Sequence, residues 1–573
     1  EGANLVDGEC QMDYGVRVDS VGYLTNRRKT AVFHSESSSF SIRRVDNDES
    51  VFDGEADGPN VARDTGEELY VADFTALKDA GTYYVQTTEG RSPEFSIGAD
   101  ALGSVLVATM QGLYGQRCGV GVELEHDADA FAHEACHLEE ASLSRVGEGS
   151  RDDTGGWHDA GDYGKYVNNG AFAVAFLLKA FEHFPAFSRE LALEIPEAGD
   201  DVPDLLDESR VELEWLLKVQ YEDGSFAHKV TALHFEGMVM PEMDKQQRYF
   251  ISASSASTAD AVGALALAAR LYEPYDKDFA QRCLESATKG QDWLDANLEA
   301  LAPKQSDVET GGYTGGPDQD ERIWALAEMW ETTGNEAYLA DLEERIAEWG
   351  ASNEFDWPNA ANLALSTYLR SERKGRNPAI RSRIAQSFLS VADGLAKAAH
   401  DDVYGRATPA YYWGSNGVVA RFAFNWITAY YVEPKPEYLD GIQQQLDHLL
   451  GLNYYGRSFV TGVGEKPPRF PHHRPSEADR VDNPWPGLLI GGPHTRLFTE
   501  PEDSRAEYPA KTWTDTAPNY LHNEIAINWN TALAYALVAV AAANEDAKPC
   551  ADCIVEDGAG GSGGGGGAGG AGQ

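Results

Sequence analysis

The sequence predicts a mainly α-helical protein, an (α/α)6 barrel preceded by a small all-β sandwich. Short β-branched and aromatic runs separated by turn residues occupy residues 14–98, whereas apolar residues recur with a helical period from Ala101 onward. About twelve helical segments follow Ala101, a number that fits six helical hairpins closed in a ring. These observations predict two folded domains in one chain of 573 residues.

The leading segment contains six short runs that are typical of strands. They are YGVRVDSVGYL, KTAVFHS, SFSIRRVD, ELYVADFTAL, GTYYVQTT and PEFSIG. Close spacing of such runs predicts an antiparallel sandwich of the immunoglobulin type, and the last two runs are expected to form a hairpin. We assign residues 10–98 to this domain.

The helical region is assigned to residues 99–546. The segment from Leu439 to Leu450, with apolar side chains at Ile442 and Leu446, shows a clear amphipathic face. Long loops at 222–250, 300–320 and 452–522 are expected to carry function. The helices are expected to start near residues 101, 169, 205, 257, 278, 320, 335, 358, 378, 414, 436 and 523. Residues 558–573 are Gly-rich and predict a flexible tail or linker.

The charge balance is strongly acidic, with 93 Asp and Glu against 46 Lys and Arg and a net charge of −47. This charge disfavours binding to nucleic acid and to anionic membranes. Because salt screens self-repulsion, we interpret the charge as adaptation to high salt, as in a halophile; an ordinary acidic secreted protein is the alternative.

The sequence contains no run of about 18 apolar residues, so it predicts no membrane span. The start, EGANLVDGEC, lacks the basic and apolar regions of a secretory leader, which is compatible with a mature or a cytoplasmic form. We expect an exported, extracellular monomer.

The stretch GGWHDAGDYGKYV places Asp159 and Asp162 around an Ala-Gly pair, beside His158, Trp157 and Tyr163. A surface turn would explain the glycine and one aspartate. It would not explain two aromatic residues of the kind that is usually buried.

A second acidic site lies far along the chain, where Glu524 is expected to begin a helix with Asn523 as its cap. A carboxylate in a first helical turn is common, because it favours the helix dipole. The setting is more specific, since it contains Trp513, Asp515, Tyr520 and Trp529. A third motif, SFVTGVGEKPPRFPHHRPS, places His472, His473 and Arg474 in a Pro-rich loop.

Together these motifs resemble glycoside hydrolase family 9, the inverting cellulases, over residues 14–545. The family's C-terminal signature is matched in its spacing by Trp513, Asp515, Tyr520 and Glu524. The family's other signature is matched by residues 458–474, and the DAGD motif is the third sequence feature that it shares with this chain. The β domain followed by QRCGV and ACHLEEA resembles the subgroup with an N-terminal immunoglobulin-like domain.

The resemblance implies that Asp162 is the general base that activates water, that Asp159 helps to hold this water, and that Glu524 is the general acid. Inverting hydrolysis needs two carboxyl groups about 6.5–9.5 Å apart, on opposite sides of the sugar. Neighbouring acids resist ionising together, so their pKa values should separate. The alternatives are a loop turn or a calcium site for the two aspartates.

Substrate contacts are implied at the Pro-rich loop and at several aromatic positions. Arg474 offers a planar fork of donors for sugar hydroxyls, and His472 lies beside it; an ordinary surface loop is the alternative. Aromatic rings suit the apolar faces of glucose, although buried aromatics are more often core residues. The implied platforms are Trp324, Tyr412, Trp413, Tyr520 and Trp529. The family commonly has tyrosine where Trp529 stands, and a wider ring there could reshape a subsite.

The subgroup carries a structural zinc ion, and its four ligands can be placed at Cys118, Cys136, His137 and His158. Two thiolates and two imidazoles make a closed tetrahedral set. Buried free thiols are the alternative, and a disulfide between Cys118 and Cys136 would exclude zinc. The other close pair of cysteines, at 550 and 553, is expected to form a local disulfide.

Calcium is a weaker expectation, at Asp318 and Asp320 in a Gly-rich loop, where oxygen ligands could gather. The resemblance implies an endo-β-1,4-glucanase whose partner is a β-1,4-glucan. The alternatives are an exo-acting family member, namely a cellobiohydrolase, β-glucosidase or glucosaminidase, and a non-catalytic carbohydrate-binding protein. Retention of Asp159, Asp162 and Glu524 together argues against the last alternative.

Overall fold

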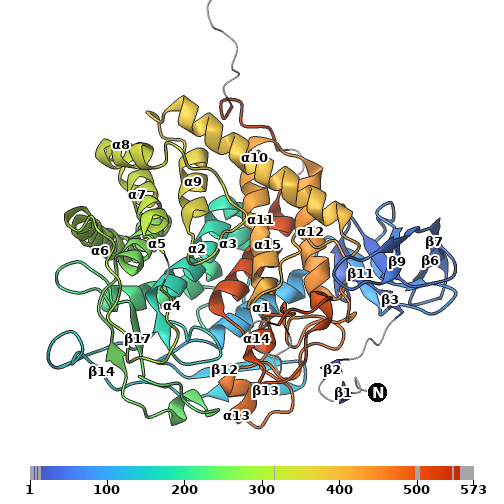
Figure 1. Ribbon diagram of the computed structural model, residues 1–573, viewed down its shortest axis with the longest axis horizontal. Helices are drawn as coiled ribbons and strands as arrows, with labels where there is room; N and C mark the ends of the chain where they lie inside the picture. Colours follow the sequence, from blue (N-terminus) through green and yellow to red (C-terminus); the bar gives the residue numbers. More distant parts are fainter. Residues whose placement is uncertain are drawn as a thin grey trace, which may run out of the picture.

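The computed structural model describes the backbone of residues 5–6 and 9–10, where β1 (Leu5–Val6) pairs with β2 (Glu9–Cys10), and residues 15–314, 316–496, 504–544 and 547–554. The expected tail at 558–573 lies outside these described residues. Figure 1 shows a large helical body with a small β domain at one side.

The β domain consists of two facing sheets. One sheet has the order β3-β5-β9-β8 and the other the order β4-β11-β10-β6-β7. The strands are β3 (Val16–Arg17), β4 (Gly22–Leu24), β5 (Thr30–Phe33), β6 (Ser39–Arg44), β7 (Ser50–Glu55), β8 (Asp57–Val61), β9 (Glu68–Asp73), β10 (Gly81–Gln86) and β11 (Phe95–Gly98). Alternate side chains of both sheets, including Tyr23, Phe33, Ile42 and Tyr83, fill one core between them. The predicted sandwich is therefore confirmed.

Strand pairing agrees with the predicted terminal hairpin and departs from the prediction at one edge. β10 pairs with β11 in antiparallel register, with Tyr83 opposite Phe95. β4, however, runs parallel to β11, with Tyr23 opposite Ile97. Every other pairing within the two sheets is antiparallel.

The helical body is built from long helices that alternate between an outer and an inner ring. The inner helices are α2 (Val167–His183), α5 (Ser255–Tyr272), α7 (Gln319–Thr333), α9 (Ala361–Arg370), α11 (Ser415–Val432) and α15 (Ile527–Ala542). The outer helices are α1 (Gly103–Tyr114), α4 (Asp204–Lys218), α6 (Lys277–Ala296), α8 (Glu336–Arg345), α10 (Pro378–Asp401) and α12 (Pro436–Leu450).

The inner ring closes on itself. Each inner helix contacts the next, from α2 to α5, α7, α9, α11 and α15, and α15 returns to α2. These helices are buried on nearly all sides, whereas outer helices such as α6 and α10 bury one face, as helices at a surface do. The predicted (α/α)6 barrel is confirmed.

Short elements that periodicity did not predict connect the long helices. The short helices are α3 (Pro185–Glu190), α13 (Arg474–Ala478), α14 (Tyr520–Asn523), η1 (Pro241–Met243) and η2 (Pro509–Lys511). A hairpin is formed by β12 (Val122–His126) and β13 (Asp129–His133). A five-stranded sheet is formed by β15 (Ser150–Arg151), β14 (Ala141–Ser142), β18 (Tyr249–Phe250), β17 (Lys229–Thr231) and β16 (Lys165–Tyr166). This sheet lies at the end of the barrel that carries the site described below.

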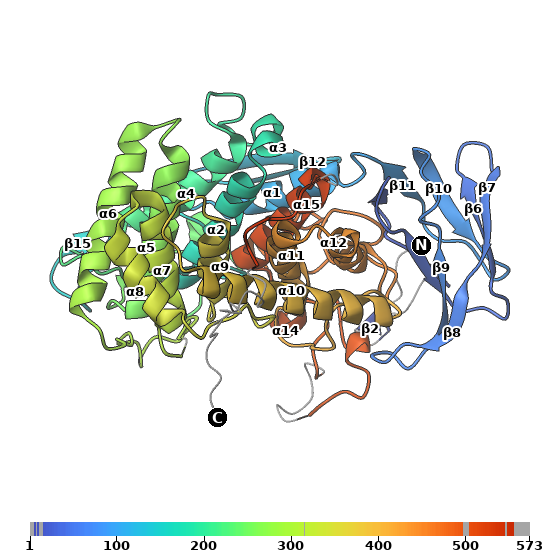
Figure 2. The same ribbon diagram turned by 90° about the horizontal axis from the view of Figure 1, so that it is seen from above.

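The β domain docks against the end of α12 (Figure 2). The backbone N–H of Ser20 donates to the carbonyl oxygen of Leu450 at 3.1 Å. Arg17 forms an ion pair with Glu67 at 2.8 Å and contacts the hydroxyl of Tyr404 from the barrel. Val32, Ala62 and Leu69 of the β domain also share an apolar cluster with barrel residues, so polar and apolar contacts together join the two domains.

Among the described residues, no helix combines the length and the apolar character that a membrane crossing requires.

Candidate active site

Asp159 and Asp162 lie in the loop that leads through β16 into the inner helix α2, and both are buried. Asp159 accepts hydrogen bonds at both oxygens, from Asn169 Nδ2 at 2.8 Å and from the Tyr313 hydroxyl at 2.6 Å. One oxygen of Asp162 accepts from the Tyr166 hydroxyl at 2.8 Å and from the backbone N–H of Gly164 at 3.0 Å. Because these donors fix each carboxylate, the loop presents both in a defined orientation.

Gly161 explains why the turn between the two aspartates contains a glycine. A Cβ at this position would lie 2.1 Å from the carbonyl oxygen of His472. Only glycine therefore lets the segment around His472 cross the loop of the two aspartates this closely.

Glu524 does not begin a helix, which corrects the sequence prediction. It follows α14 in an extended conformation, with φ −63° and ψ 150°, and α15 begins at Ile527. Asn523 lies inside α14, where its side chain accepts from Trp513 Nε1 at 2.8 Å instead of capping α15. Hydrogen bonds across the site explain this break, since the strand-like segment around Glu524 pairs with other segments.

Two of these pairings join the Glu524 segment to the rest of the site. Ala526 forms an antiparallel bridge with Ala160, and Glu524 forms a parallel bridge with His472. The backbone N–H of His472 donates to the Asn523 carbonyl oxygen at 2.7 Å. All three sequence motifs therefore meet at one place.

Burial and the charges of neighbouring carboxylates shift the pKa values of Glu524 and Asp159. Burial, followed by the charges of Asp162 and Asp159, raises the pKa of Glu524 well above its ordinary value. Burial and then Asp162 likewise raise the pKa of Asp159, while hydrogen bonds from Tyr313 and Asn169 act in the opposite direction. These effects favour the protonated form of Glu524, which is the state that a proton donor needs.

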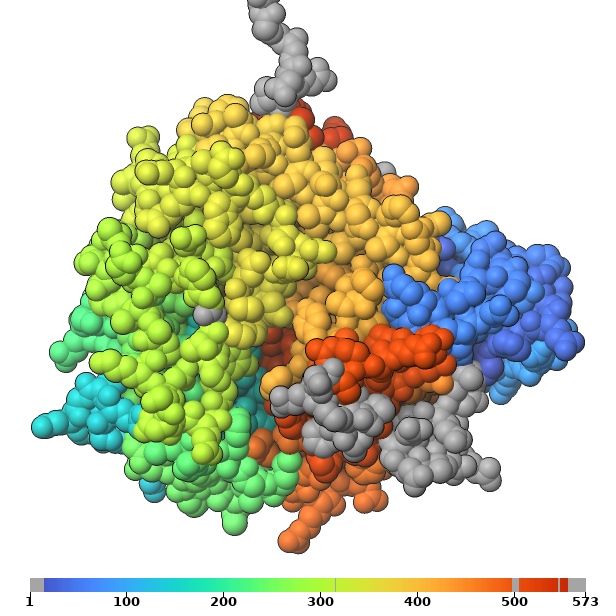
Figure 3. Space-filling view, viewed as in Figure 1, coloured from blue at the N-terminus to red at the C-terminus, as the bar shows by residue number. Residues whose placement is uncertain are grey.

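The three carboxyl groups line one cleft with a volume of about 280 Å³. Figure 3 shows a hollow on this face between the yellow-green and the orange to red segments of the chain. The lining residues are Asp159, Ala160, Asp162, Tyr166, Phe235, Gly311, Gly312, Tyr313, Asp356, Trp357, Trp413, Glu524, Ala526, Asn528 and Trp529. Carboxyl groups and aromatic rings together suit a sugar chain.

Four of the five predicted aromatic platforms lie at or near this cleft. Trp413 and Trp529 line it. Tyr412, Trp413 and Tyr520 are exposed to solvent, and the rings of Trp413 and Tyr520 meet edge to face with centroids 5.6 Å apart. Trp529 packs beside Gly414, where a Cβ would lie 2.4 Å from its ring.

Trp324 is the exception, and its assignment as a sugar platform is wrong in this structure. Its ring is 0% exposed on α7, packs against Gly263 of α5, and donates from Nε1 to Glu328 at 3.2 Å. A ring enclosed between inner helices has no face for a sugar, so Trp324 is a core residue.

The residues of the Pro-rich loop contact the segment before Glu524 and the loop of the two aspartates. His472 Nδ1 donates to the Ala517 carbonyl oxygen at 2.7 Å, which leaves Nε2 of the neutral ring as an acceptor. Arg474 is buried; it contacts the Gly161 carbonyl oxygen and pairs with Glu236 at 2.6 Å. In this structure Arg474 fixes the loop of the two aspartates, and its fork is not free for sugar hydroxyls.

Sequence reasoning missed several residues that line the cleft or hold its carboxylates. They are Tyr166, Asn169, Phe235, Tyr313, Asp356, Trp357 and Asn528. Tyr166 and Asn169 follow the DAGD motif closely, and their position beside it is a signal that could have identified them. Tyr313 lies in the loop 300–320, which the sequence predicts to carry function, but no motif singles out this residue. Trp357 lies in a loop without any such signal.

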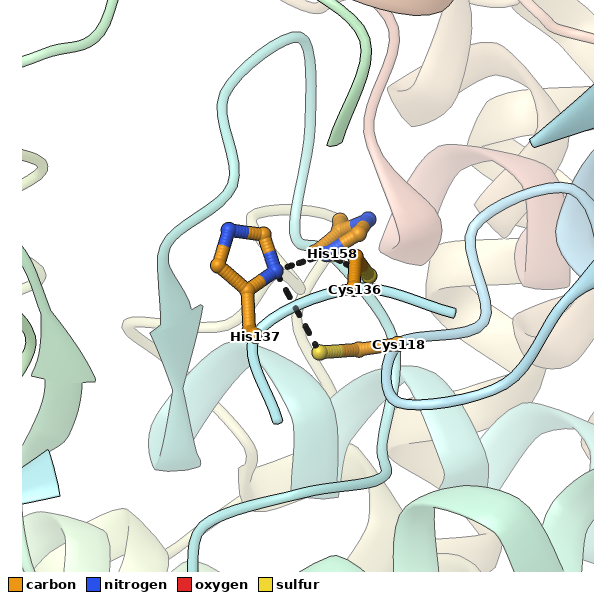
Figure 4. A group of neighbouring side chains, drawn as sticks. All are labelled: Cys118, Cys136, His137 and His158. Atoms are coloured by element: carbon orange, nitrogen blue, oxygen red, sulfur yellow. Dashed lines mark hydrogen bonds between the residues drawn. The ribbon is translucent and has the colours of Figure 1, made fainter. Parts of the chain in front are cut away.

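The predicted metal ligands form a compact group, drawn in Figure 4. Ligand atoms of Cys118, Cys136, His137 and His158 all lie within 4.8 Å of one another, and both cysteines are free thiols. His158 Nε2 lies 3.3 Å from His137 Nδ1, and each thiol lies 3.7 Å from a ring nitrogen. Tetrahedral zinc with bonds of about 2.0–2.1 Å to nitrogen and 2.3 Å to sulfur requires separations of about 3.3 Å and 3.6 Å. The donor set and its spacing therefore fit a tetrahedral ion.

A carboxylate supports this group from outside. His137 directs its other nitrogen, Nε2, to Asp244 at 3.3 Å. Such carboxylate–histidine pairs orient imidazole ligands in metal sites. Sequence reasoning did not identify Asp244, which comes from a loop far from the four ligands.

The predicted calcium ligands, Asp318 and Asp320, do not form a comparable group of ligands. Asp318 pairs with Arg322 at 2.9 Å, and Asp320 accepts from the backbone N–H of Ala360 at 2.7 Å. Within the described chain, neither belongs to a group of three close ligand residues. The expected local disulfide between Cys550 and Cys553 is confirmed.

Comparisons with known proteins agree with this site. The model of "Glycosyl hydrolase family 9" matches residues 103–537, and that of "Cellulase N-terminal ig-like domain" matches residues 12–92. Endoglucanase D of Acetivibrio thermocellus is 40% identical over 92% of this chain and 83% of that protein. A xyloglucan-specific endo-beta-1,4-glucanase of Bacteroides ovatus is 30% identical over 90% of this chain and 92% of that protein.

Solved structures show the same architecture. A metagenome-derived family 9 endoglucanase has a TM-score of 0.85 at 36% identity, over 92% of this chain and 99% of that one. A Zn-binding triple mutant of the family 9 endoglucanase J30 has a TM-score of 0.84 at 30% identity, over 91% and 99%. The chain is a glycoside hydrolase and belongs to glycosyl hydrolase family 9, with an N-terminal immunoglobulin-like domain.

Proposed function

We propose that the protein is an endo-β-1,4-glucanase that cleaves internal bonds of cellulose or a related β-glucan with inversion. One observation carries the assignment of the site: the bridge between Ala160 and Ala526 brings the aspartate pair and Glu524 to the same cleft. The relatives named above support the substrate class, since their names describe endoglucanases.

The proposed reaction uses two carboxyl groups on opposite sides of the scissile bond. Glu524 gives its proton to the glycosidic oxygen as the bond to the anomeric carbon breaks. Asp162 takes a proton from water as the water oxygen bonds to that carbon from the other face, which inverts its configuration. Asp159, held by Tyr313 and Asn169, orients the water.

Endo action is tested by comparing viscosity with reducing ends in solutions of a soluble cellulose derivative. Internal cleavage predicts a steep loss of viscosity while few reducing ends have formed. Slow loss of viscosity with early release of short sugars would show exo action instead. The Asp162→Asn variant is the control. Any loss of viscosity or release of reducing ends that this variant also causes does not come from catalysis at the site.

We also propose that Cys118, Cys136, His137 and His158 hold a structural zinc ion. The two thiolates and two imidazoles match zinc's preferred ligands, and Asp244 supports His137. Four protein ligands leave no open position, so zinc would fix the loop before Asp159 and would do no chemistry itself.

We further propose that the protein is an exported, salt-adapted monomer. The net charge of −47 supports this, because screening by salt would relieve self-repulsion in the folded state. The melting temperature should rise from low to molar salt, while size-exclusion chromatography at each salt concentration reports the oligomeric state. An unchanged melting temperature would reject salt adaptation, and a dimer at every concentration would reject the monomer.

A further inference from the structure

One short segment, residues 310–313, contacts the groups that hold both aspartates. The Tyr313 hydroxyl donates to Asp159 at 2.6 Å. The backbone N–H of Gly311 donates to the Tyr166 hydroxyl at 3.1 Å, and this hydroxyl in turn donates to Asp162 at 2.8 Å. A shift of segment 310–313 would therefore move the donors of both carboxylates together.

The backbone of this segment is held in an unfavourable conformation. Tyr313 has φ +43°, in the left-handed region that a bulky side chain seldom adopts. Such a conformation persists only where the surroundings fix it. The contacts that hold Tyr313 in this conformation therefore also help to place its hydroxyl on Asp159.

Two adjacent residues, His228 just before β17 and Lys229 at its start, bind three consecutive carbonyl groups of the segment. His228 Nε2 donates to the Gly312 carbonyl oxygen at 2.8 Å. Lys229 Nζ donates to the Gly311 carbonyl oxygen at 2.7 Å and to that of Thr310 at 3.3 Å. His228 and Lys229 are fully buried and do not line the cleft, so neither touches a bound substrate. Lys229 also pairs with Tyr166 in the sheet and its charge acts on Asp162, so it supports the same two aspartates from a second side.

The orientation of His228 is itself fixed. Burial lowers the pKa of His228 to about 4, so the ring is neutral and carries one proton. Because a carbonyl oxygen only accepts, that proton is on Nε2, facing Gly312. Nδ1 lies 3.2 Å from the Ser254 hydroxyl, which can donate to it, and 2.9 Å from the Ser257 hydroxyl, which donates to Asn168 Oδ1.

We propose that His228 and Lys229 are positioning residues for hydrolysis, which hold segment 310–313 so that Tyr313 and Tyr166 keep Asp159 and Asp162 in their reactive orientation. The inference rests on the proposed catalytic roles of these aspartates. It assigns to β17, which no sequence motif covers, a function in the geometry of the reaction.

The test is steady-state kinetics of His228→Ala and Lys229→Met on a soluble glucan. Both variants should lower kcat about 10- to 100-fold, because displacement of a catalytic group by about 1 Å costs on this order. KM should stay within about twofold, since the sugar-binding rings of the cleft remain in place. His228→Gln, which keeps a donor near the position of Nε2, should recover most of kcat.

Lys29→Met is the matched control. Lys29 is also fully buried, and its Nζ donates to two carbonyl oxygens, of Thr25 and Arg27, both at 2.8 Å, but within the β domain. It should lower the melting temperature and leave kcat unchanged. An equal loss of kcat in Lys29→Met would show that the effect is one of general stability and would overturn the proposal.

A double-mutant cycle keeps the inference testable if one variant folds poorly. Tyr313→Phe removes only the hydroxyl group on Asp159, so it should lower kcat on its own. Combined with Lys229→Met, it should add little further loss, because the Lys229 change already displaces the Tyr313 hydroxyl from Asp159. Fully additive losses, or wild-type kcat in both the His228 and Lys229 variants, would overturn the inference. Wild-type activity of Asp162→Asn would instead refute the proposed function.

Discussion

The backbone N–H of Ile527 donates a hydrogen bond of 2.9 Å to the carbonyl oxygen of Asp159. This bond joins the start of α15 to the loop of the two aspartates, beside the bridge between Ala160 and Ala526. The proposed acid and base are therefore placed by one continuous backbone frame.

The role of Glu524 predicts a dependence on the leaving group. Glu524→Gln should lower kcat on natural glucans by about 10²–10⁴, the usual contribution of a general acid. The loss should be much smaller on an aryl cellobioside with an acidic phenol, because such a leaving group departs without a proton. Rates on both substrates measure the difference.

The matched control is Glu433→Gln, an exposed carboxyl group at the end of α11. It should retain wild-type rates on both substrates. Equal losses of Glu524→Gln on the glucan and on the aryl substrate would contradict a role in proton donation.

Replacement of Trp413 is expected to shift the pH profile of kcat/KM. A hydrogen bond from its side chain lowers the pKa of Glu524, against the larger raising effects of burial and of Asp162. Trp413→Phe keeps an aromatic ring and removes this bond, so the pKa of Glu524 should rise. The acid then stays protonated to higher pH, and the basic limb of kcat/KM should move upward. A downward shift would contradict the assignment.

Removal of metal should damage catalysis as well as stability. Because His158 directly precedes Asp159, loss of the ion should loosen the catalytic loop. Elemental analysis should find about one zinc per chain. A strong chelator should lower both the melting temperature and kcat, and added zinc should restore both.

Cysteine variants supply the control for the metal site. Cys118→Ser should lose the metal, whereas Cys283→Ser, a change to another buried free thiol away from the group, should retain it. Undialysed protein without zinc, or full activity of the metal-free protein, would reject this account.

A pair of buried aspartates at the domain interface predicts how stability depends on pH. Asp19 of the β domain and Asp447 of α12 are 0% exposed and interact through their side chains. Burial raises the pKa of Asp19 to about 7, and burial together with the charge of Asp19 raises that of Asp447. Lys29 and Arg28 lie nearby, but Lys29 Nζ is used by carbonyl oxygens.

Because the folded pKa of Asp19 exceeds the ordinary value of 3.8, the folded state binds more protons than the unfolded state between about pH 4 and 7. The pair therefore contributes stability below about pH 4 that is lost as the pH rises through 7. Asp447→Asn should flatten this decline in melting temperature. Asp53→Asn, at an exposed site on β7, should leave this decline unchanged. If Asp447→Asn also leaves the decline in melting temperature with pH unchanged, the role of the Asp19–Asp447 pair is contradicted.

The sequence predicted the barrel well because long amphipathic helices carry a repeated signal. The starts expected at 378 and 436 are those of α10 and α12. The two-residue strands β14 and β16 are too short to show any period, so the sheet beside the site was missed.

The errors at the site have physical causes. Trp324 lies on an inner helix that is buried on all sides, so periodicity could not tell a cleft-facing residue from a core residue. The break before Glu524 comes from pairing with Ala160 and His472, which are distant in sequence. Tyr313 reaches Asp159 from the loop 300–320, whose length predicts function, but only the folded chain shows that contact.

The stereochemistry of the first product tests the central claim most directly. If Asp162 activates water on the face opposite to Glu524, hydrolysis of a β-1,4-linked cello-oligosaccharide must give the α-anomer first. Proton NMR within the first minutes, before mutarotation, distinguishes the two anomers. The account predicts an initial α-anomer signal followed by slow growth of the β-anomer. An initial β-anomer signal would contradict it.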